Sequence, residues 1–272
     1  LAALLREQAA GDAEARADAE RLLLHLLGKP RSWLYAHLSD PADAALAGDF
    51  LAAWARMRAG EPLPSVTGEA EFWGRSFLVD RRVLIPRPDS ECLLGVALEA
   101  VAEGEPVTVV DAGTGSGALA VSLALERPQA LVLACDHSAD ALAVASANAR
   151  RLGAAVVFWQ GDWLAALAPA SVDGVMSNPP YLAPDDIHLP ELRAGGEPES
   201  ALVAAEQGFA DLARIAEQAR RVLRPGGWLA MEHGHMQGQA TRRMLARLGY
   251  RDVGTRQDMA GRDRVVCGRR CG

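Results

Sequence analysis

An apolar run followed at once by a glycine-rich turn restricts the folds open to this chain. Val107–Val110 is apolar apart from one threonine, and Asp111–Gly117 reads Asp-Ala-Gly-Thr-Gly-Ser-Gly before a helical pattern that continues to Leu125. Parallel strands buried on both faces show such apolar runs, and a glycine-rich turn between strand and helix opens a βαβ unit. The stretch therefore predicts an α/β domain with a parallel sheet and a ligand at this turn.

The spacing and charge of the turn indicate which nucleoside cofactor it binds. Dinucleotide-binding turns place a pyrophosphate at the helix N-terminus and prefer Gly-x-Gly-x-x-Gly, whereas this turn has Gly-x-Gly-x-Gly. A carboxylate at Asp111 would repel a pyrophosphate and attract an ammonium group. We therefore expect S-adenosylmethionine as cofactor and S-adenosylhomocysteine as product. The expected contacts in this stretch are Asp111, Gly113, Thr114, Gly115, Ser116 and Gly117.

Two later strand ends carry residues suited to the same cofactor. The apolar run Leu131–Cys135 ends in Asp136, which can accept both ribose hydroxyls or, alternatively, cap the next helix. A third strand at 155–159 leads to Asp162 and Trp163, which can bind the adenine amine and stack on its ring. The alternatives are a turn-forming aspartate and a core tryptophan. We prefer the cofactor roles because ligands bind at the carboxyl ends of parallel strands.

A fourth apolar run, 174–177, ends abruptly in Asn178-Pro179-Pro180-Tyr181. Consecutive prolines donate no backbone hydrogen bond and hold φ at about −65°, so the chain leaves the sheet rigidly. A stiff turn with a packed tyrosine is one interpretation. Beside a methyl donor, the Asn178 side-chain oxygen and the Pro179 carbonyl can each accept one hydrogen of a planar amide, while Tyr181 offers a stacking face. We predict that these four residues are catalytic and that Asn178 also contacts the cofactor.

The flanking regions have different patterns. Residues 1–64 have apolar residues at helical spacing and predict a small bundle that docks the substrate, with a purely stabilising appendage as the alternative. Residues 65–88 predict a β-hairpin that turns at Gly74, followed by a proline-fixed linker. The methyltransferase domain is expected at 89–272.

Charge and composition argue against several other functions. The net charge is −7 and the only lysine is Lys29, which disfavours non-specific binding to the phosphate backbone of nucleic acid. No uncharged apolar run reaches the about 18 residues of a membrane span. The four cysteines are scattered, and His233 with His235 lacks a metal-binding pattern. We expect a cytoplasmic monomer that binds no metal and contacts neither nucleic acid nor membrane.

These motifs together resemble the HemK/PrmC family, the peptide chain release factor glutamine methyltransferases, over nearly the whole chain. The residues that carry the resemblance are Glu71–Gly74, Val83–Pro88, Asp111–Gly117, Asp136, Ser177–Tyr181, Glu197-Pro198, Ala201-Leu202, Pro225–Gly227 and Arg264–Gly268. Two segments depart from the family pattern. Asp89–Glu91 stands where the family usually has Glu-Thr-Glu, and His233 follows Glu232 where the family tends to have an aliphatic residue.

The resemblance implies a seven-stranded, Rossmann-like class I methyltransferase sheet. It also implies methyl transfer to the side-chain amide nitrogen of the glutamine in the Gly-Gly-Gln motif of class 1 release factors. Adenine-amine methyltransferases share Asn-Pro-Pro-Tyr and provide one alternative, although the net charge of −7 counts against a nucleic-acid substrate. A non-catalytic module that binds release factor is another, and the complete glycine turn and tetrapeptide count against it.

Overall fold

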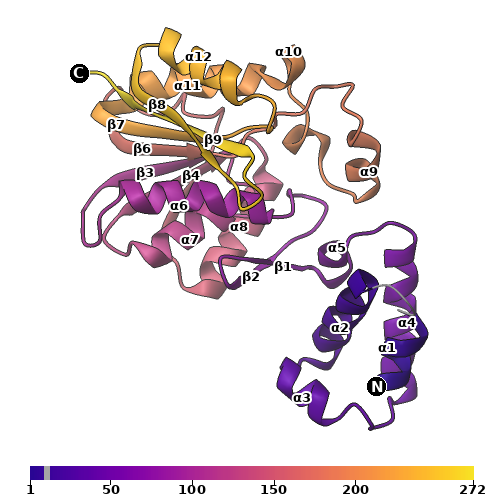
Figure 1. The fold of residues 1–272 in the computed structure, drawn as a ribbon. Coiled ribbons are helices and arrows are strands. Elements are labelled where there is room, and N and C mark those ends of the chain that lie inside the picture. Colours follow the sequence, from indigo (N-terminus) through magenta and orange to yellow (C-terminus); the bar gives the residue numbers. More distant parts are fainter. Residues whose placement is uncertain (9–12) are drawn as a thin grey trace. The chain divides into compact units, whose positions relative to one another are not determined.

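The computed structural model describes residues 1–8 and 13–272, which form two compact units. The first unit consists of Leu1–Gly68 and Ala194–Gly196, and the second of Glu69–Arg193 and Glu197–Gly272. Figure 1 shows helices in the first unit and a sheet with helices on both faces in the second. In the described part of the chain, no helix is long and apolar enough to span a membrane.

The first unit is helical and has its own hydrophobic core. Its helices are α1 (Ala2–Gln8), α2 (Ala13–Leu27), α3 (Arg31–Ala36), α4 (Ala44–Arg58) and α5 (Leu63–Thr67). The Asp43 side chain accepts a hydrogen bond from the Leu46 amide at 2.7 Å and so caps the start of α4. Leu22, Leu23 and Phe50 are almost completely buried between these helices. The helical character predicted for this region is confirmed in the described residues.

The second unit is built on a seven-stranded sheet, as predicted. Its strands are β3 (Thr108–Ala112), β4 (Leu131–Asp136), β5 (Val156–Gln160), β6 (Val172–Ser177), β7 (Leu223–Glu232), β8 (Tyr250–Gln257) and β9 (Asp263–Arg270). Their order is β5-β4-β3-β6-β7-β9-β8. The first five are parallel to one another, and β9 pairs antiparallel with both β7 and β8. The carboxyl ends of the five parallel strands therefore share one edge of the sheet.

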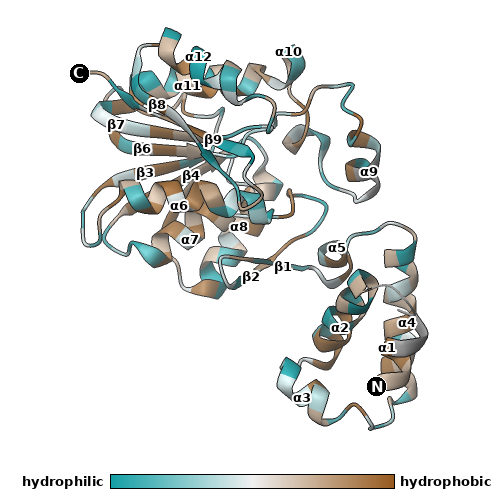
Figure 2. Ribbon diagram, in the orientation of Figure 1, coloured by the Kyte–Doolittle hydropathy of each residue, from teal (hydrophilic) through white to brown (hydrophobic). Residues whose placement is uncertain are grey.

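Helices cover both faces of this sheet (Figure 1). One face carries α6 (Glu91–Ala100), α7 (Ala118–Glu126) and α8 (Ala139–Leu152), and the other carries α11 (Ala210–Val222) and α12 (Gly238–Arg247). Helix α7 is buried at every position from Ala118 to Ala124, and Figure 2 shows it as hydrophobic. Helix α11 instead buries one stripe, Leu212, Ile215, Ala216, Ala219 and Val222, as a helix with a solvated outer face does.

The predicted hairpin consists of β1 (Glu69–Phe72) and β2 (Arg75–Leu78). Trp73 and Gly74 form its turn with φ of 51° and 67°, because a two-residue hairpin loop that follows the strand twist needs positive φ at both positions. Asn148 of α8 accepts from the Leu78 amide at 2.7 Å and donates to the Leu78 carbonyl at 3.0 Å. The hairpin thus packs within the second unit, so the boundary in the structure follows residue 68 and not residue 88.

Short elements complete the carboxyl edge of the sheet. They are the 3₁₀ turns η1 (Pro88–Ser90) and η2 (Glu199–Ala201) and the short helices α9 (Leu189–Ala194) and α10 (Ala205–Gly208). Three of them lie in the segment between β6 and α11. An isolated parallel bridge between Leu182 and Val203 closes this segment on itself.

Candidate active site

The glycine-rich turn after β3 forms the floor of a cavity of about 610 Å³. Gly113, Gly115 and Gly117 have φ of 78°, 54° and 83°, a conformation that favours glycine. A Cβ atom on Gly113 would lie 2.7 Å from the Trp163 ring, so the turn and this ring approach more closely than a side chain permits. Four of the six contacts predicted in this turn line the cavity: Gly113, Thr114, Gly115 and Ser116. Gly117 instead lies against Ala145 of α8.

Asp111 lies beneath the turn and is not among the residues that line the cavity. It is fully buried, and its Oδ2 accepts a hydrogen bond from the Thr114 hydroxyl at 2.7 Å. Burial raises the pKa of the Asp111 carboxyl to about 7, opposed by hydrogen bonds from Thr114 and the backbone of Ala120. Through Thr114, Asp111 therefore holds the turn in place.

Asp136 lines the cavity at the end of β4. Its Oδ2 accepts from the Gly115 amide at 3.0 Å, and its Oδ1 accepts from the Ser138 amide at 2.9 Å. His137 Nδ1 lies 3.4 Å from Oδ1, while Oδ2 keeps a second acceptor site for a ribose hydroxyl. Helix α8 is capped by Ser138, whose hydroxyl accepts from the Ala141 amide at 3.2 Å. The alternative role considered for Asp136, helix capping, thus belongs to Ser138.

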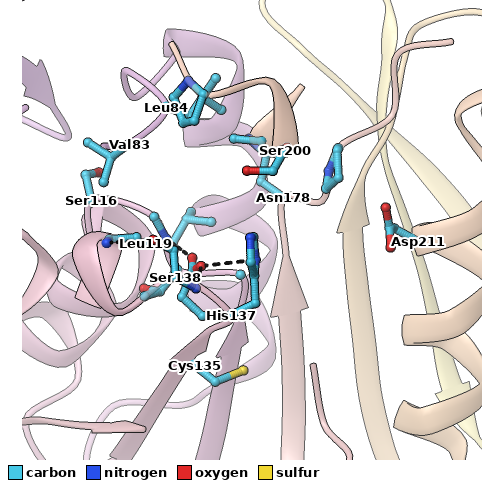
Figure 3. Close-up of a pocket in the computed structure, with 18 of the residues that line it drawn as sticks. Val83, Leu84, Ser116, Leu119, Cys135, His137, Ser138, Asn178, Ser200 and Asp211 are labelled. Carbon is cyan, nitrogen blue, oxygen red and sulfur yellow. Dashed lines mark hydrogen bonds and ion pairs between the residues drawn. The ribbon is translucent and has the colours of Figure 1, made fainter. Parts of the chain in front are cut away.

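Asp162 and Trp163 both line the same cavity, as do two residues of α11 that the sequence did not predict. Asp162 forms an ion pair with Arg214, and each side chain is half-exposed. Burial raises the pKa of the Asp211 carboxyl, while Trp163 and Arg214 lower it. Figure 3 shows Asp211 at the cavity with Asn178, which comes from a different segment. The sequence carried no signal that the first turns of α11 reach the cavity.

The tetrapeptide leaves β6 where this cavity adjoins a second one of about 600 Å³. Pro180 lines the first cavity, Pro179 and Tyr181 line the second, and Asn178 lines both. The Ser177 hydroxyl donates to the Ala112 carbonyl at 2.6 Å and so ties the end of β6 to the end of β3. Molecules bound in the two cavities would therefore meet at Asn178.

Two buried residues hold both ends of the tetrapeptide. Asn178 Nδ2 donates to Ser90 Oγ at 3.0 Å, and the Ser90 hydroxyl donates to Glu232 Oε2 at 2.6 Å. The Tyr181 hydroxyl donates to Glu232 Oε1 at 3.0 Å. Burial raises the pKa of the Glu232 carboxyl, and burial with the nearby Glu232 charge raises the pKa of Tyr181. The sequence placed Ser90 and Glu232 only in segments that depart from the family pattern and gave them no role in the site.

The proline-rich segment at residues 83–88 forms one wall of the second cavity and is fixed by two acidic residues. Glu197 accepts from the Ile85 amide at 2.9 Å and forms an ion pair with Arg87 at 2.5 Å. Asp89 forms an ion pair with Arg264 of β9 at 3.0 Å. Arg87, Asp89 and Arg264 line the cavity, which gives it charged groups of both signs.

Within residues 1–8 and 13–272, no cluster of three or more His, Cys, Asp or Glu side chains is arranged to hold a metal ion. His233 is buried, with Nδ1 2.8 Å from the Gly234 carbonyl oxygen. His235 lines the second cavity. The two histidines thus face different surroundings.

Comparison with known proteins gives matches to both parts of the chain. Residues 2–68 match the family described as PrmC N-terminal domain, and residues 104–258 match the family described as methyltransferase domain. The release factor glutamine methyltransferase of Bordetella pertussis is 45% identical over 97% of this chain and 98% of its own length. Those of Salmonella typhimurium and Escherichia coli K12 are 43% and 41% identical, each over 93% of this chain and 92% of its own length.

Among solved structures, a methyltransferase from Pyrococcus furiosus has a TM-score of 0.56 with this chain. The two are 17% identical over 80% of this chain and 98% of the other. This likeness concerns the fold alone.

Proposed function

The chain belongs to the release factor glutamine methyltransferase family, and from this premise we propose how its two cavities perform the reaction. One cavity binds S-adenosylmethionine, and the other receives the glutamine of the Gly-Gly-Gln motif of a class 1 peptide chain release factor. The observation that carries the proposal is the position of Asn178, which lines both cavities. A methyl group and an acceptor nitrogen held on either side of this residue are adjacent.

The residues of the first cavity suit a nucleoside cofactor with a charged amino-acid end. Its volume of about 610 Å³ falls within the range of roughly 300–1,000 Å³ typical of small-molecule sites. In the proposal, the turn Gly113–Ser116 lies against the cofactor, Asp136 accepts the ribose hydroxyls and Trp163 packs on the adenine ring. The Asp162 carboxylate is already paired with Arg214, so it would bind the adenine amine and Arg214 at the same time. When bound, S-adenosylmethionine supplies an electrophilic methyl group and leaves as S-adenosylhomocysteine.

The second cavity supplies the groups that aim the acceptor. An amide nitrogen is a poor nucleophile because its lone pair is delocalised into the carbonyl, so orientation contributes much of the rate. Asn178 Oδ1 and the Pro179 carbonyl each accept one of the two amide hydrogens, which points the nitrogen towards the first cavity. Pro179 and Pro180 add no N–H donor that would compete, and the Tyr181 ring packs against the planar amide.

The helical first unit is proposed to dock the release factor, in keeping with its match to the PrmC N-terminal domain. The enzyme would then act as a monomer on a protein substrate, without direct contact to nucleic acid. Because release factors act in translation, the proposal places the reaction in the cytoplasm.

The decisive experiment incubates the protein with S-adenosylmethionine labelled in its methyl group and a class 1 release factor. A matched copy of the release factor has its Gly-Gly-Gln glutamine replaced by alanine. We expect label on the first and none on the second, with the methylated amide identified by mass spectrometry. Equal labelling of the two copies, or methyladenine formed on added DNA or RNA in place of protein labelling, would contradict the proposal.

A further inference from the structure

A chain of hydrogen bonds connects a buried carboxyl group to the amide of Asn178. It runs from Glu232 at the end of β7 through Ser90 in η1 to Asn178 at the end of β6. The first link, Ser90 Oγ to Glu232 Oε2, measures 2.6 Å, and the second, Asn178 Nδ2 to Ser90 Oγ, measures 3.0 Å. Glu232 is 1% exposed and Ser90 is 4% exposed, so the first link is shielded from water.

The direction of every hydrogen in this chain follows from the chemistry of Glu232. An ionised carboxylate only accepts hydrogen bonds, so the hydroxyl hydrogen of Ser90 must point to Oε2 and that of Tyr181 to Oε1. The Ser90 oxygen then has only lone pairs left for Asn178. Asn178 must therefore present its NH₂ group to Ser90, which turns Oδ1 away from Ser90.

We propose that Ser90 and Glu232 are positioning residues that fix the Asn178 amide with its oxygen, and not its NH₂ group, towards the substrate. This inference rests on the proposed function, in which Asn178 Oδ1 accepts a hydrogen from the substrate amide. The juxtaposition of these three side chains from η1, β6 and β7 is its structural basis.

The orientation matters because the two ends of an asparagine amide have nearly the same shape and opposite hydrogen-bonding character. With Oδ1 towards the substrate, Asn178 accepts a hydrogen from the acceptor amide. With its NH₂ group there instead, two donors would face each other, and the substrate amide would turn its nitrogen away. Nothing in the shape of the asparagine prevents this flip, so a hydrogen-bond partner on the far side must select the orientation.

Glu232 also fixes the other end of the tetrapeptide. Its Oε1 accepts from the Tyr181 hydroxyl at 3.0 Å, so one carboxylate holds both the amide and the aromatic ring that flank Pro179 and Pro180. The Gln237 side chain adds a second restraint by donating to the Tyr181 carbonyl at 3.0 Å. Tyr181 thus keeps both of these restraints if the Ser90 link is removed, which makes Ser90 the selective place to test the proposal.

The test compares Ser90→Ala with Ser90→Thr, using labelled S-adenosylmethionine and a class 1 release factor. Ser90→Ala removes the hydrogen-bond acceptor for Asn178, and we expect kcat to fall by about 10- to 100-fold, as small misplacements of reacting groups do. KM for the release factor and Kd for S-adenosylmethionine should each change by less than about threefold. Ser90→Thr keeps the hydroxyl and should restore most of kcat. Ser171→Ala removes a hydroxyl from the turn before β6 and serves as the matched control.

A readout that does not depend on activity is the side-chain NH₂ signal of Asn178 in a ¹⁵N-labelled sample, assigned by its loss in Asn178→Ala. In Ser90→Ala we expect an upfield shift of its hydrogen-bonded proton, whereas Ser90→Thr should leave the signal near its original place. Glu232→Gln, which brings a donor into the relay, should also move this signal and lower kcat by about tenfold or more.

The possible results separate this inference from the proposed function. If the wild-type protein labels no release factor glutamine, the proposed function fails, and the NMR comparison still tests the orientation of Asn178. If the wild-type protein is active and Ser90→Ala keeps both its kcat and its Asn178 signal, the positioning role is overturned. If Ser90→Ala does not fold, as judged by circular dichroism, Glu232→Gln and Ser90→Thr decide in its place.

Discussion

The two cavities that meet at Asn178 are built in different ways. The first is floored by stretches that directly follow consecutive strands, such as Gly113–Ser116 after β3 and Asp136–Ser138 at the end of β4. Local backbone conformation and nearby hydrogen bonds hold these stretches. The second cavity is assembled from segments far apart in the chain, near residues 84–89, 178–188, 201–207, 234–237 and 264. Side-chain ion pairs and buried hydrogen bonds join these segments.

The two cavities should therefore tolerate different substitutions. The floor of the first cavity is made of local turns whose backbone packs closely against neighbouring atoms. Binding there should therefore be most sensitive to a substitution that adds an atom where none fits. A site made of distant segments depends on the direction of particular side-chain hydrogen bonds, so it should be most sensitive where one donor or acceptor is lost. The predictions below separate these two kinds of sensitivity.

The largest effect is expected for Asn178→Ala, because Asn178 serves both cavities. We expect kcat to fall by about 10³-fold or more through loss of the group that aims the acceptor. Cofactor affinity should stay within about tenfold, roughly 1.4 kcal/mol. Single-turnover transfer and calorimetric titration with S-adenosylmethionine measure the two quantities. Loss of cofactor binding by several orders of magnitude would show that Asn178 belongs mainly to the first cavity.

Gly113→Ala should show the backbone sensitivity of the first cavity. The added Cβ would lie 2.7 Å from the Trp163 ring at a φ of 78°, so either the turn or the ring must shift. We expect Kd for S-adenosylmethionine to rise by about 100-fold, near 2.7 kcal/mol. Gly153→Ala is the control, because its φ of 73° is similarly strained and its Cβ would meet no atom within 4 Å. Equal losses of affinity in both variants would assign the effect to general strain.

The pH dependence of kcat should report on the Glu232 carboxyl, which orients Asn178 through Ser90. Burial raises the pKa of the Glu232 carboxyl, so on acidification Glu232 gains a proton before exposed glutamates do. Once protonated, it can donate to Ser90, and the fixed orientation of Asn178 is lost. At saturating cofactor, kcat should therefore fall by about tenfold as the pH drops through this raised pKa. The other ionisable groups around Glu232 are Tyr181, Arg264, Asp89 and Cys92.

Glu232→Gln is the control for this pH profile. Its kcat should be low and should lack the acidic decline, since the titrating group is gone. Cofactor affinity must be followed over the same pH range, because the Asp111 carboxyl beneath the turn has a pKa raised to about 7. An unchanged acidic decline in Glu232→Gln would assign the titration to another group.

The smallest effect is expected for Asp162→Asn. Its carboxylate is half-exposed and already paired with Arg214, and exposed pairs of this kind contribute only about 0–1 kcal/mol. We expect Kd for S-adenosylmethionine to change by less than about threefold. A change of 30-fold or more would show that Asp162 holds the adenine amine directly and that the Arg214 pair gives way to the cofactor.

Much of the fold could be predicted because its signals are local. The strand at Leu131–Asp136 was located by an apolar run that does not depend on distant residues. The hairpin turn at Gly74 was located by composition in the same way. Where the hairpin belongs could not be predicted, because its place in the second unit depends on Asn148, which is 70 residues from Leu78 in the sequence.

Part of the candidate site could also be predicted from the sequence. Asp136 and the glycine turn line the first cavity because the carboxyl ends of parallel strands meet at one edge. Asp111 was expected to attract the cofactor, and in the structure it lies below the turn, where it accepts from Thr114. A residue at a strand end can point either into the cavity or beneath it, and only the packed turn decides between the two.

Local sequence patterns were enough to predict the class of fold, the turn that suits a nucleoside cofactor and the rigid exit at Asn178-Pro179-Pro180-Tyr181. Each of these depends on neighbours along the chain, through glycine φ values, proline rings and strand periodicity. The orientation of the Asn178 amide depends instead on the packed structure. It is set by Ser90, which is 88 residues from Asn178 in the sequence, and by Glu232, which is 142 residues from Ser90. These residues come together only when η1, β6 and β7 pack against one another.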